Sequence, residues 1–120
     1  MANILLVEDD PLISRMLTLR LSLRDHTVTP AENGQEALEM AQASPFDLIL
    51  MDMHMPVMDG HVATRKLREA GYVGLIVAVT ASVMSQESDA AIESGCDNYI
   101  SKPVGDDFEQ QVEALLAAHR

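Results

Sequence analysis

The sequence is poor in cysteine, in basic residues and in long apolar runs, and each shortage argues against a class of protein. A single cysteine, Cys96, cannot form an internal disulfide and is typical of a small buried side chain. Eight basic against nineteen acidic residues give a formal charge of −11, which disfavours direct binding to nucleic acid or to an anionic membrane. Apolar stretches such as Leu75–Val79 are far shorter than the roughly 20 residues of a membrane span, and no signal-like N-terminal region is present. We therefore expect a cytoplasmic protein.

The chain has the length and composition of one globular domain. Of its 120 residues, 48% are hydrophobic, which is enough for a substantial core. No linker, repeat or low-complexity tract interrupts it. We therefore expect one domain over residues 1–120.

Short apolar runs alternate with segments of helical periodicity along the whole chain. The predicted strands are Ile4–Val7, Thr27–Thr29, Leu48–Met51, Leu75–Val79 and Asn98–Ile100. The predicted helices are Leu12–Arg24, Gln35–Ala43, His61–Glu69, Gln86–Ser94 and Phe108–Ala118. Because the connections are short, the strands should be joined by right-handed βαβ crossovers. The pattern predicts an α/β fold, a doubly wound (βα)5 domain with a parallel five-stranded sheet.

Charged and hydroxyl side chains follow the ends of four predicted strands. They are Glu8, Asp9, Asp10, Asp52, Thr80 and Lys102. The carboxyl ends of parallel strands meet at one edge of a sheet, so the acids should crowd one another. Two carboxylates about 5 Å apart repel by roughly 3 kcal/mol at an effective dielectric of about 20, so such a cluster should raise its pKa values or bind a cation. Ligation by oxygen alone favours Mg²⁺ over zinc.

The same groups fit the chemistry of an aspartyl phosphate. Asp52 would be the nucleophile, Mg²⁺ and Lys102 would neutralise the phosphoryl oxygens, and Thr80 would donate a hydrogen bond. Each residue also has a plainer explanation: Asp10 can cap a helix, Thr80 can end a strand, and Lys102 can be a solvated surface residue. Four strand ends that all carry suitable groups favour the phosphoryl reaction over separate coincidences.

Four motifs identify a family resemblance that covers the whole chain. ILLVEDDP, LILMDMHMPVMDG, VAVTAS and YISKP occur in an order and at spacings similar to those of the receiver domains of two-component response regulators. The chain resembles both chemotaxis-type single-domain regulators and the receivers of hybrid sensor kinases. The resemblance implies a flavodoxin-like sheet with the strand order 2-1-3-4-5.

The resemblance also implies a role for each matching residue. The implied phosphoacceptor is Asp52. The implied Mg²⁺ ligands are Glu8, Asp9, Asp52 and the backbone carbonyl of His54. The implied phosphate-binding and switch residues are Thr80, Lys102 and Tyr99. Two departures from the family pattern, His54 and Ser82, flank the path of the attacking water and are expected to tune the lifetime of the phosphate.

By this resemblance the protein is a signalling switch and not an enzyme, except that it catalyses its own phosphorylation and dephosphorylation. A histidine kinase or histidine phosphotransfer protein donates the phosphoryl group, and the altered conformation regulates a protein partner. A monomer or a weak homodimer is expected. The alternative is a degenerate receiver that binds partners without phosphorylation.

Two other functions of similar folds are disfavoured. A phosphatase of the haloacid-dehalogenase type needs a second aspartate two residues after the nucleophile, where this chain has His54. A flavin-binding module needs a phosphate loop rich in glycine and hydroxyl groups after the first strand. The acids at 8–10 stand there instead and would repel a flavin phosphate.

The first predicted helix carries two apolar stripes. Ile13, Leu17 and Leu21 have the spacing of a core-facing stripe, and a second stripe is displaced from it by roughly a quarter to a third of a turn. The second stripe consists of Leu12, Met16, Leu19 and Leu23. It is either part of a wide buried face or an exposed surface on which Leu12 and Met16 dock a helical histidine-phosphotransfer bundle.

Overall fold

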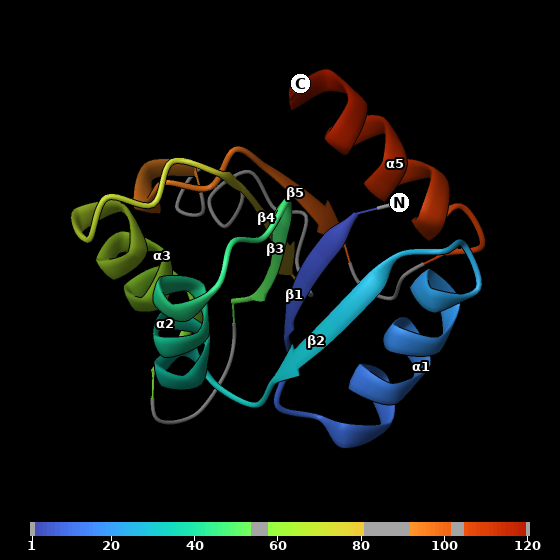
Figure 1. Cartoon of the computed structure of the whole chain (residues 1–120), viewed down its shortest axis with the longest axis horizontal. Helices are drawn as coiled ribbons and strands as arrows, with labels where there is room; N and C mark the ends of the chain where they lie inside the picture. The colour runs from blue at the N-terminus through green and yellow to red at the C-terminus, as the bar shows by residue number, and fades with distance from the viewer. Residues whose placement is uncertain (1, 54–57, 81–91, 102–104, 120) are drawn as a thin grey trace.

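The computed structural model describes residues 2–53, 58–80, 92–101 and 105–119, which form a parallel sheet with helices on both faces (Figure 1). The strands are β1 (Asn3–Val7), β2 (Thr27–Ala31), β3 (Leu48–Asp52), β4 (Leu75–Thr80) and β5 (Asn98–Ser101). The helices are α1 (Pro11–Ser22), α2 (Gly34–Ala43), α3 (Gly60–Glu69) and α5 (Phe108–His119). None of the helices in these ranges is long and apolar enough to cross a membrane.

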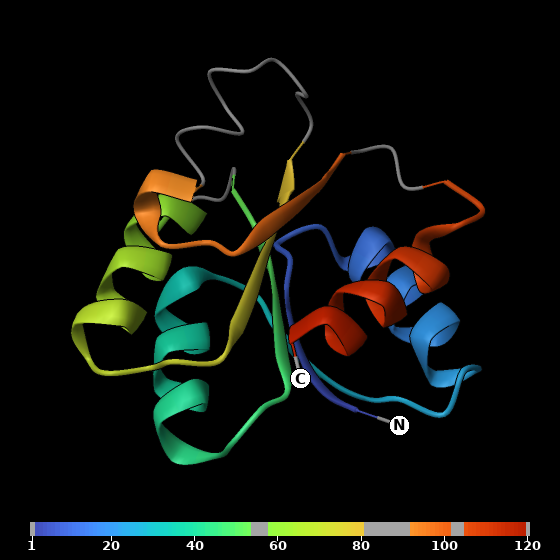
Figure 2. The ribbon, with the colours of Figure 1, turned by 90° about the horizontal axis from the view of Figure 1, so that it is seen from above.

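The sheet has the predicted topology. Its five strands lie in the order β2-β1-β3-β4-β5, and every neighbouring pair is parallel. Helices α2 and α3 cover one face, while α1 and α5 cover the other (Figure 2). The doubly wound α/β fold predicted from the alternation of strands and helices is confirmed.

Each of these strands and helices differs from its predicted bounds by one or two residues, and the larger differences, in β2 and α1, have local reasons. Strand β2 continues through Pro30 to Ala31, and the proline is tolerated there because β2 is an edge strand and needs no ladder donor on its open side. Helix α1 starts one residue earlier, at Pro11, and ends at Ser22, shortly before Asp25 takes a left-handed φ of 66° that no right-handed helix contains. Most of the predicted helix over 86–94 lies outside the described residues, and 92–94 are helical.

Alternation along the strands divides the core into two layers. In β1, Ile4 and Leu6 belong to the layer under α1 and α5, and Leu5 and Val7 to the layer under α2 and α3. Every residue of β3 and β4 is buried, as expected for central strands covered on both faces. Side chains of both core layers pack on β1, β3 and β4. The carboxyl ends of these three strands are therefore fixed relative to one another.

Candidate functional site

Three carboxylates meet at the carboxyl ends of β1 and β3. One oxygen from each of Glu8, Asp9 and Asp52 lies within 4.8 Å of the other two. Glu8 and Asp52 are each only 4% exposed, whereas Asp9 is exposed. The pairing of β1 with β3 sets Val7 beside Met51, so the residues that follow them emerge together. The structure thus brings together three acids that are up to 44 positions apart in the sequence.

The three consecutive acids after β1 have two different structural roles. Glu8 continues the sheet, because its amide donates to the Ala31 carbonyl at 3.0 Å, and its carboxylate accepts from the Asp9 amide at 3.1 Å. Asp10 turns away and caps α1, where its Oδ1 accepts from the amides of residues 12 and 13 at 2.9 and 3.3 Å. The plainer explanation of Asp10 is therefore the one that the structure supports.

Thr80 ends the strand next to Asp52. Asp52 pairs with Val79 on β4, so Thr80 is one residue beyond the partner of the acid, and it is 1% exposed. On β5, Ser101 pairs with Thr80, while Tyr99 pairs with Ala78 and is 39% exposed. The two predicted switch residues therefore differ: one is buried beside the acid cluster and the other is partly open to solvent.

Helix α3 begins against the backbone of the acid cluster. Asp59 caps the helix by accepting from the Val62 amide at 2.9 Å, and the Gly60 amide donates to the Met53 carbonyl at 3.3 Å. A Cβ placed on Gly60 would collide with the Asp52 carbonyl oxygen and lie 2.7 Å from the Met53 Cα. Only glycine allows this close approach, so the start of α3 helps to fix the end of β3.

Three predicted site residues lie outside the described residues. They are His54, whose carbonyl is a predicted ligand and whose side chain is a predicted tuning group, Ser82 and Lys102. The roles expected for them therefore stay predictions.

The three acids fit a hard divalent cation. They offer oxygen ligands alone, and two of them are buried, so the mutual repulsion of their ionised forms is costly unless a positive charge offsets it. Mg²⁺ commonly binds few carboxylates and keeps several waters, which suits a cluster with one member exposed to solvent. The predicted magnesium cluster is therefore compatible with the observed donor set.

The second apolar stripe of α1 is exposed. Leu12 and Leu23 are each 75% exposed, Leu19 is 59% exposed and Met16 is 43% exposed. The first stripe faces the core, with Leu17 and Leu21 buried and Ile13 partly buried against them. The interpretation of the second stripe as part of a wide buried face is wrong, because no neighbouring element covers that side of α1 among the described residues.

Of the hollows among the described residues, two lie at opposite ends of the strands. One of about 690 Å³ adjoins the acid cluster and is lined by Glu8, Asp9, Leu19, Glu32 and Glu36, among others. That Glu32 and Glu36 line this hollow was not predicted. Both residues follow β2, and the rule that parallel strands place their carboxyl ends at one edge of the sheet could have indicated them.

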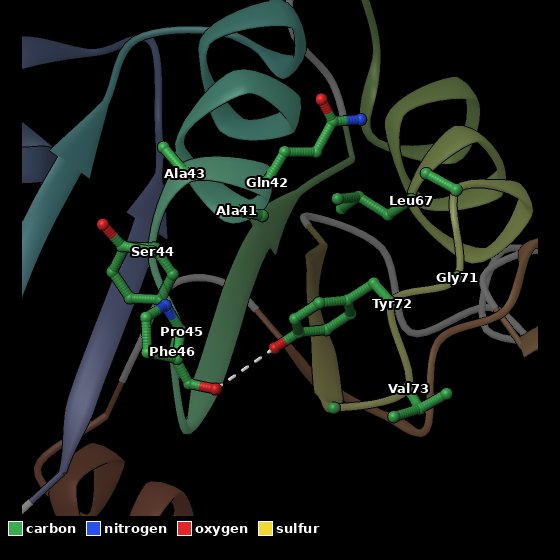
Figure 3. A pocket seen from close by; sticks show the side chains of 12 residues that line it. Ala41, Gln42, Ala43, Ser44, Pro45, Phe46, Leu67, Gly71, Tyr72 and Val73 are labelled. Carbon is green, nitrogen blue, oxygen red and sulfur yellow. Dashed lines mark hydrogen bonds between the residues drawn. The ribbon is translucent and has the colours of Figure 1, made fainter.

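The other hollow, of about 610 Å³, lies before β3 and β4, between the ends of α2 and α3 (Figure 3). The described residues that line it carry no charged side chain, and the Tyr72 hydroxyl donates to the Phe46 carbonyl at 3.5 Å. The charged hollow is therefore the one that adjoins candidate chemistry.

Comparisons with known proteins agree with this geometry. The family model described as the response regulator receiver domain matches residues 4–115. A two-component response regulator of rice, ORR41, is 39% identical over an alignment that covers 100% of this chain and 95% of the rice protein. The sensor histidine kinase RcsC of Salmonella typhimurium is 35% identical over 95% of this chain, which spans only 12% of that kinase.

A solved structure adds a likeness in three dimensions. The receiver domain of the sensor histidine kinase PA1611 from Pseudomonas aeruginosa matches with a TM-score of 0.86 and 31% identity. The match covers 98% of this chain and 96% of that one. That structure is described as having a magnesium ion coordinated in its active site cleft.

Proposed function

Because the chain belongs to the family of response regulator receiver domains of two-component signalling, we propose that it accepts a phosphoryl group on Asp52 in a reaction that depends on Mg²⁺. The observation that carries this proposal is the meeting of Glu8, Asp9 and Asp52 within 4.8 Å at the strand ends. Glu8, Asp9, Asp52 and the His54 carbonyl would hold the cation. When bound, Mg²⁺ supplies positive charge that offsets the negative phosphoryl oxygens.

The transfer step is a displacement at phosphorus. A carboxylate oxygen of Asp52 forms the new P–O bond while the P–N bond of a phosphohistidine on the donor breaks, and the electron pair of that bond stays on the imidazole nitrogen. Lys102 and Thr80 stabilise the transferred group by donating to its oxygens. Attack of water on phosphorus later releases inorganic phosphate and restores the Asp52 carboxylate.

Phosphorylation then switches the conformation. The phosphoryl dianion offers new contacts to Thr80 and Lys102 in only one of two conformations, which shifts the equilibrium between them. Thr80 moves toward the phosphate and Tyr99 turns inward from its partly exposed position. The altered surface regulates a protein partner, so the domain acts as a switch whose only catalysis is on itself.

The donor is a histidine kinase or a histidine phosphotransfer protein, as for receiver domains in general. We assign its docking surface to the exposed stripe of α1, which starts two residues after the Asp10 cap and so lies beside the acid cluster. Exposed apolar patches of this kind commonly mark protein interfaces, and a helical donor would lay an apolar face against Leu12 and Met16.

The first experiment tests the phosphoacceptor. Wild type, Asp52→Asn and Asp10→Asn are incubated with acetyl phosphate, with and without Mg²⁺, and examined by intact mass spectrometry. We expect one added phosphoryl group that needs Mg²⁺, is lost in Asp52→Asn and persists in Asp10→Asn, because asparagine still caps α1. If wild type gains no phosphoryl group, a phosphorylation-independent binding module replaces this proposal.

A second experiment tests the docking surface. Leu12→Ala and Met16→Ala should slow phosphoryl transfer from a cognate phosphohistidine protein by about tenfold each, while leaving the rate from acetyl phosphate unchanged. The matched control is Val73→Ala, which is exposed but lies far from α1 in the loop before β4. Equal slowing with both donors, or no slowing, contradicts the assignment.

A third experiment tests the tuning residues. If His54 shields or orients the attacking water, His54→Ala should change the rate at which the phosphorylated protein loses its phosphate, and Ser82→Ala should do so as well. The decay is followed by intact mass after acetyl phosphate is removed. An unchanged decay rate in both variants removes the tuning role.

A further inference from the structure

His26 is a buried histidine that lies directly before β2, outside the candidate site. Its backbone amide donates to the Leu21 carbonyl at 3.2 Å, which fixes the residue against the end of α1. The ring lies between two other elements: Nδ1 is 3.2 Å from the amide nitrogen of Ala2, just before β1, and Nε2 is 3.1 Å from Glu113 Oε2 on α5. One imidazole thus links the start of β1 to α5.

These two contacts define where the ring carries its proton. A backbone amide can only donate, so Nδ1 is the acceptor and carries no proton. In a neutral imidazole the proton is then on Nε2, which donates to the Glu113 carboxylate. Both ring nitrogens are therefore satisfied in the neutral form of a side chain that is only 4% exposed.

The two sides of the ring differ in charge. On the side of α5, Glu113 binds the ring through Oε2, while its Oε1 accepts from Arg24 Nη2 at 2.6 Å. Arg24 and Asp25 lie in the turn between α1 and β2, on the same segment as His26. On the side of β1, the polar contact of the ring among the described residues is the uncharged Ala2 amide. A positive charge on the ring would therefore be attracted by α5 and would gain nothing from β1.

A second proton on the ring changes these contacts in opposite directions. It binds the lone pair of Nδ1, because Nε2 already carries a proton, and the new N–H bond then points at the N–H of Ala2. Two donors cannot share a hydrogen bond, and a buried amide that loses its acceptor is costly to keep in place. The bond from Nε2 to Glu113, by contrast, becomes charge-assisted at both ends and stronger.

We propose that His26 is a proton-sensitive latch: the neutral ring ties the start of β1 to α5, and protonation frees the start of β1 while α5 keeps the ring. Histidine is the side chain that ordinarily changes charge between pH 5 and 8, so the latch acts in mild acid. The Ala2 carbonyl accepts from the Thr27 amide at 2.9 Å, so release of Ala2 also opens the first bond between β1 and β2. The latch lies at the amino end of β1, whereas the acid cluster follows its carboxyl end, and it needs no phosphoryl group.

The test follows single amides by hydrogen exchange from pH 8 to pH 5, corrected for the intrinsic effect of pH on exchange. The reporter is the Thr27 amide at the start of the edge strand β2. The control is the Asp97 amide, which donates to the Ile76 carbonyl at 2.8 Å beside the start of the opposite edge strand, β5. We expect the protection of Thr27 to fall about tenfold in wild type, while that of Asp97 changes less than about twofold. Nitrogen NMR of the His26 ring at pH 8 should show the proton on Nε2.

Two variants separate the latch from other effects of pH. His26→Gln keeps an acceptor and a donor at the end of the side chain but cannot gain a proton, so its Thr27 amide should stay protected at pH 5. His61→Gln is the matched control, because His61 contacts Ser94 from α3 on the other face of the sheet. Its Thr27 amide should lose protection as in wild type.

Four results would overturn the latch. They are constant protection of Thr27 in wild type, an equal fall at Thr27 in His26→Gln, an equal fall at Asp97, which indicates a general loss of structure, and a neutral ring with its proton on Nδ1. The measurement on the ring needs only wild type, so it decides the matter even if His26→Gln does not fold.

Discussion

Helices α2 and α3 lie against each other over one face of the sheet, whereas α1 and α5 on the other face are joined by long charged side chains. A Cβ placed on Gly34 at the start of α2 would lie 2.8 Å from the Cβ of Ala63 in α3, so the two helices leave no space between them there. Across the other face, Arg20 and Arg24 pair with Glu109 and Glu113, each at 2.6 Å. Both pairs bury apolar side chains against the sheet, but ion pairs also link α1 to α5 across their surface, whereas α2 and α3 meet by close packing.

The two arrangements should respond differently to the solvent. Close packing of apolar side chains is not weakened by charge screening, whereas contacts between charges weaken as ionic strength rises and as the acids take up protons. The stability of the side formed by α1 and α5 should therefore depend on salt and pH more than that of the side formed by α2 and α3.

The largest expected effect is the loss of a core side chain on the packed side. Leu67 of α3 is 1% exposed and belongs to the layer under α2 and α3. Leu67→Ala should lower the free energy of unfolding by about 3 kcal/mol, because it removes buried methyl groups and leaves a cavity. Urea denaturation measures this, with Leu19→Ala as the control, since Leu19 on α1 is 59% exposed and should cost less than about 0.5 kcal/mol. Similar costs for both variants would contradict the burial difference.

A smaller decrease in the free energy of unfolding is expected from adding one methyl group between α2 and α3. In Gly34→Ala the new Cβ would meet the Met58 carbonyl oxygen at 2.7 Å as well as Ala63, and backbone cannot yield as a flexible side chain does. We expect a loss of about 2 kcal/mol in urea denaturation. An unchanged midpoint would mean that the two helices can separate without cost, and the contrast with α1 and α5 would disappear.

Removing a charge between α1 and α5 should lower the free energy of unfolding by less than these changes in the core. The size of the loss should depend on salt and pH. Glu109→Gln should lower the free energy of unfolding by about 1 kcal/mol at pH 7 and low salt, and by less in 1 M salt. The hydrogen bond from Arg20 lowers the pKa of Glu109 in the folded protein, so its contribution is present above its ordinary value of 4.5 and is lost as the pH falls through the folded value. The free energies of unfolding of wild type and Glu109→Gln should therefore converge at acidic pH. Glu39→Gln on α2 is the control, because the one contact of that acid among the described residues is an exposed hydrogen bond from Gln35.

The smallest effect on the free energy of unfolding is expected at alkaline pH from Cys96, which lies in the core layer under α2 and α3. Burial raises the pKa of Cys96 to about 11 from its ordinary 9.0, and its thiol lies 3.7 Å from the Thr64 hydroxyl. A raised pKa stabilises the fold below pH 9, and this contribution is lost as the pH rises toward 11. Between pH 8 and 9.5, wild type should lose about 0.8 kcal/mol more than Cys96→Ser, measured by urea denaturation at each pH. If the free energy of unfolding depends on pH equally in the two proteins, burial does not raise the pKa of the Cys96 thiol.

Much of the fold and part of the candidate site could be predicted from local patterns. The apolar run that ends at Asp52 indicated a strand covered on both faces, and β3 is buried throughout. The meeting of Glu8, Asp9 and Asp52 followed from one rule, that parallel strands place their carboxyl ends at one edge. These predictions succeeded because they depend on periodicity and on chain direction, which neighbouring residues already encode.

Other features depend on distant residues and could not be predicted. The apolar spacing of α1 is compatible with a wide buried face and with an exposed stripe, and only the arrangement of its neighbours leaves Leu12 open to solvent. Likewise, nothing near Arg20 indicates that its partner is Glu109, 89 positions away. The contact exists because α1 and α5 share one face of the sheet.

The sequence by itself determined the order of strands and helices, the sheet edge at which the acids gather and the chemistry that such a group can support, because these follow from side-chain periodicity and strand direction. The tertiary structure alone decided which apolar residues of α1 remain exposed and which charges pair across helices. The reason is physical: burial and pairing are set by distances between segments that meet only when the chain has folded.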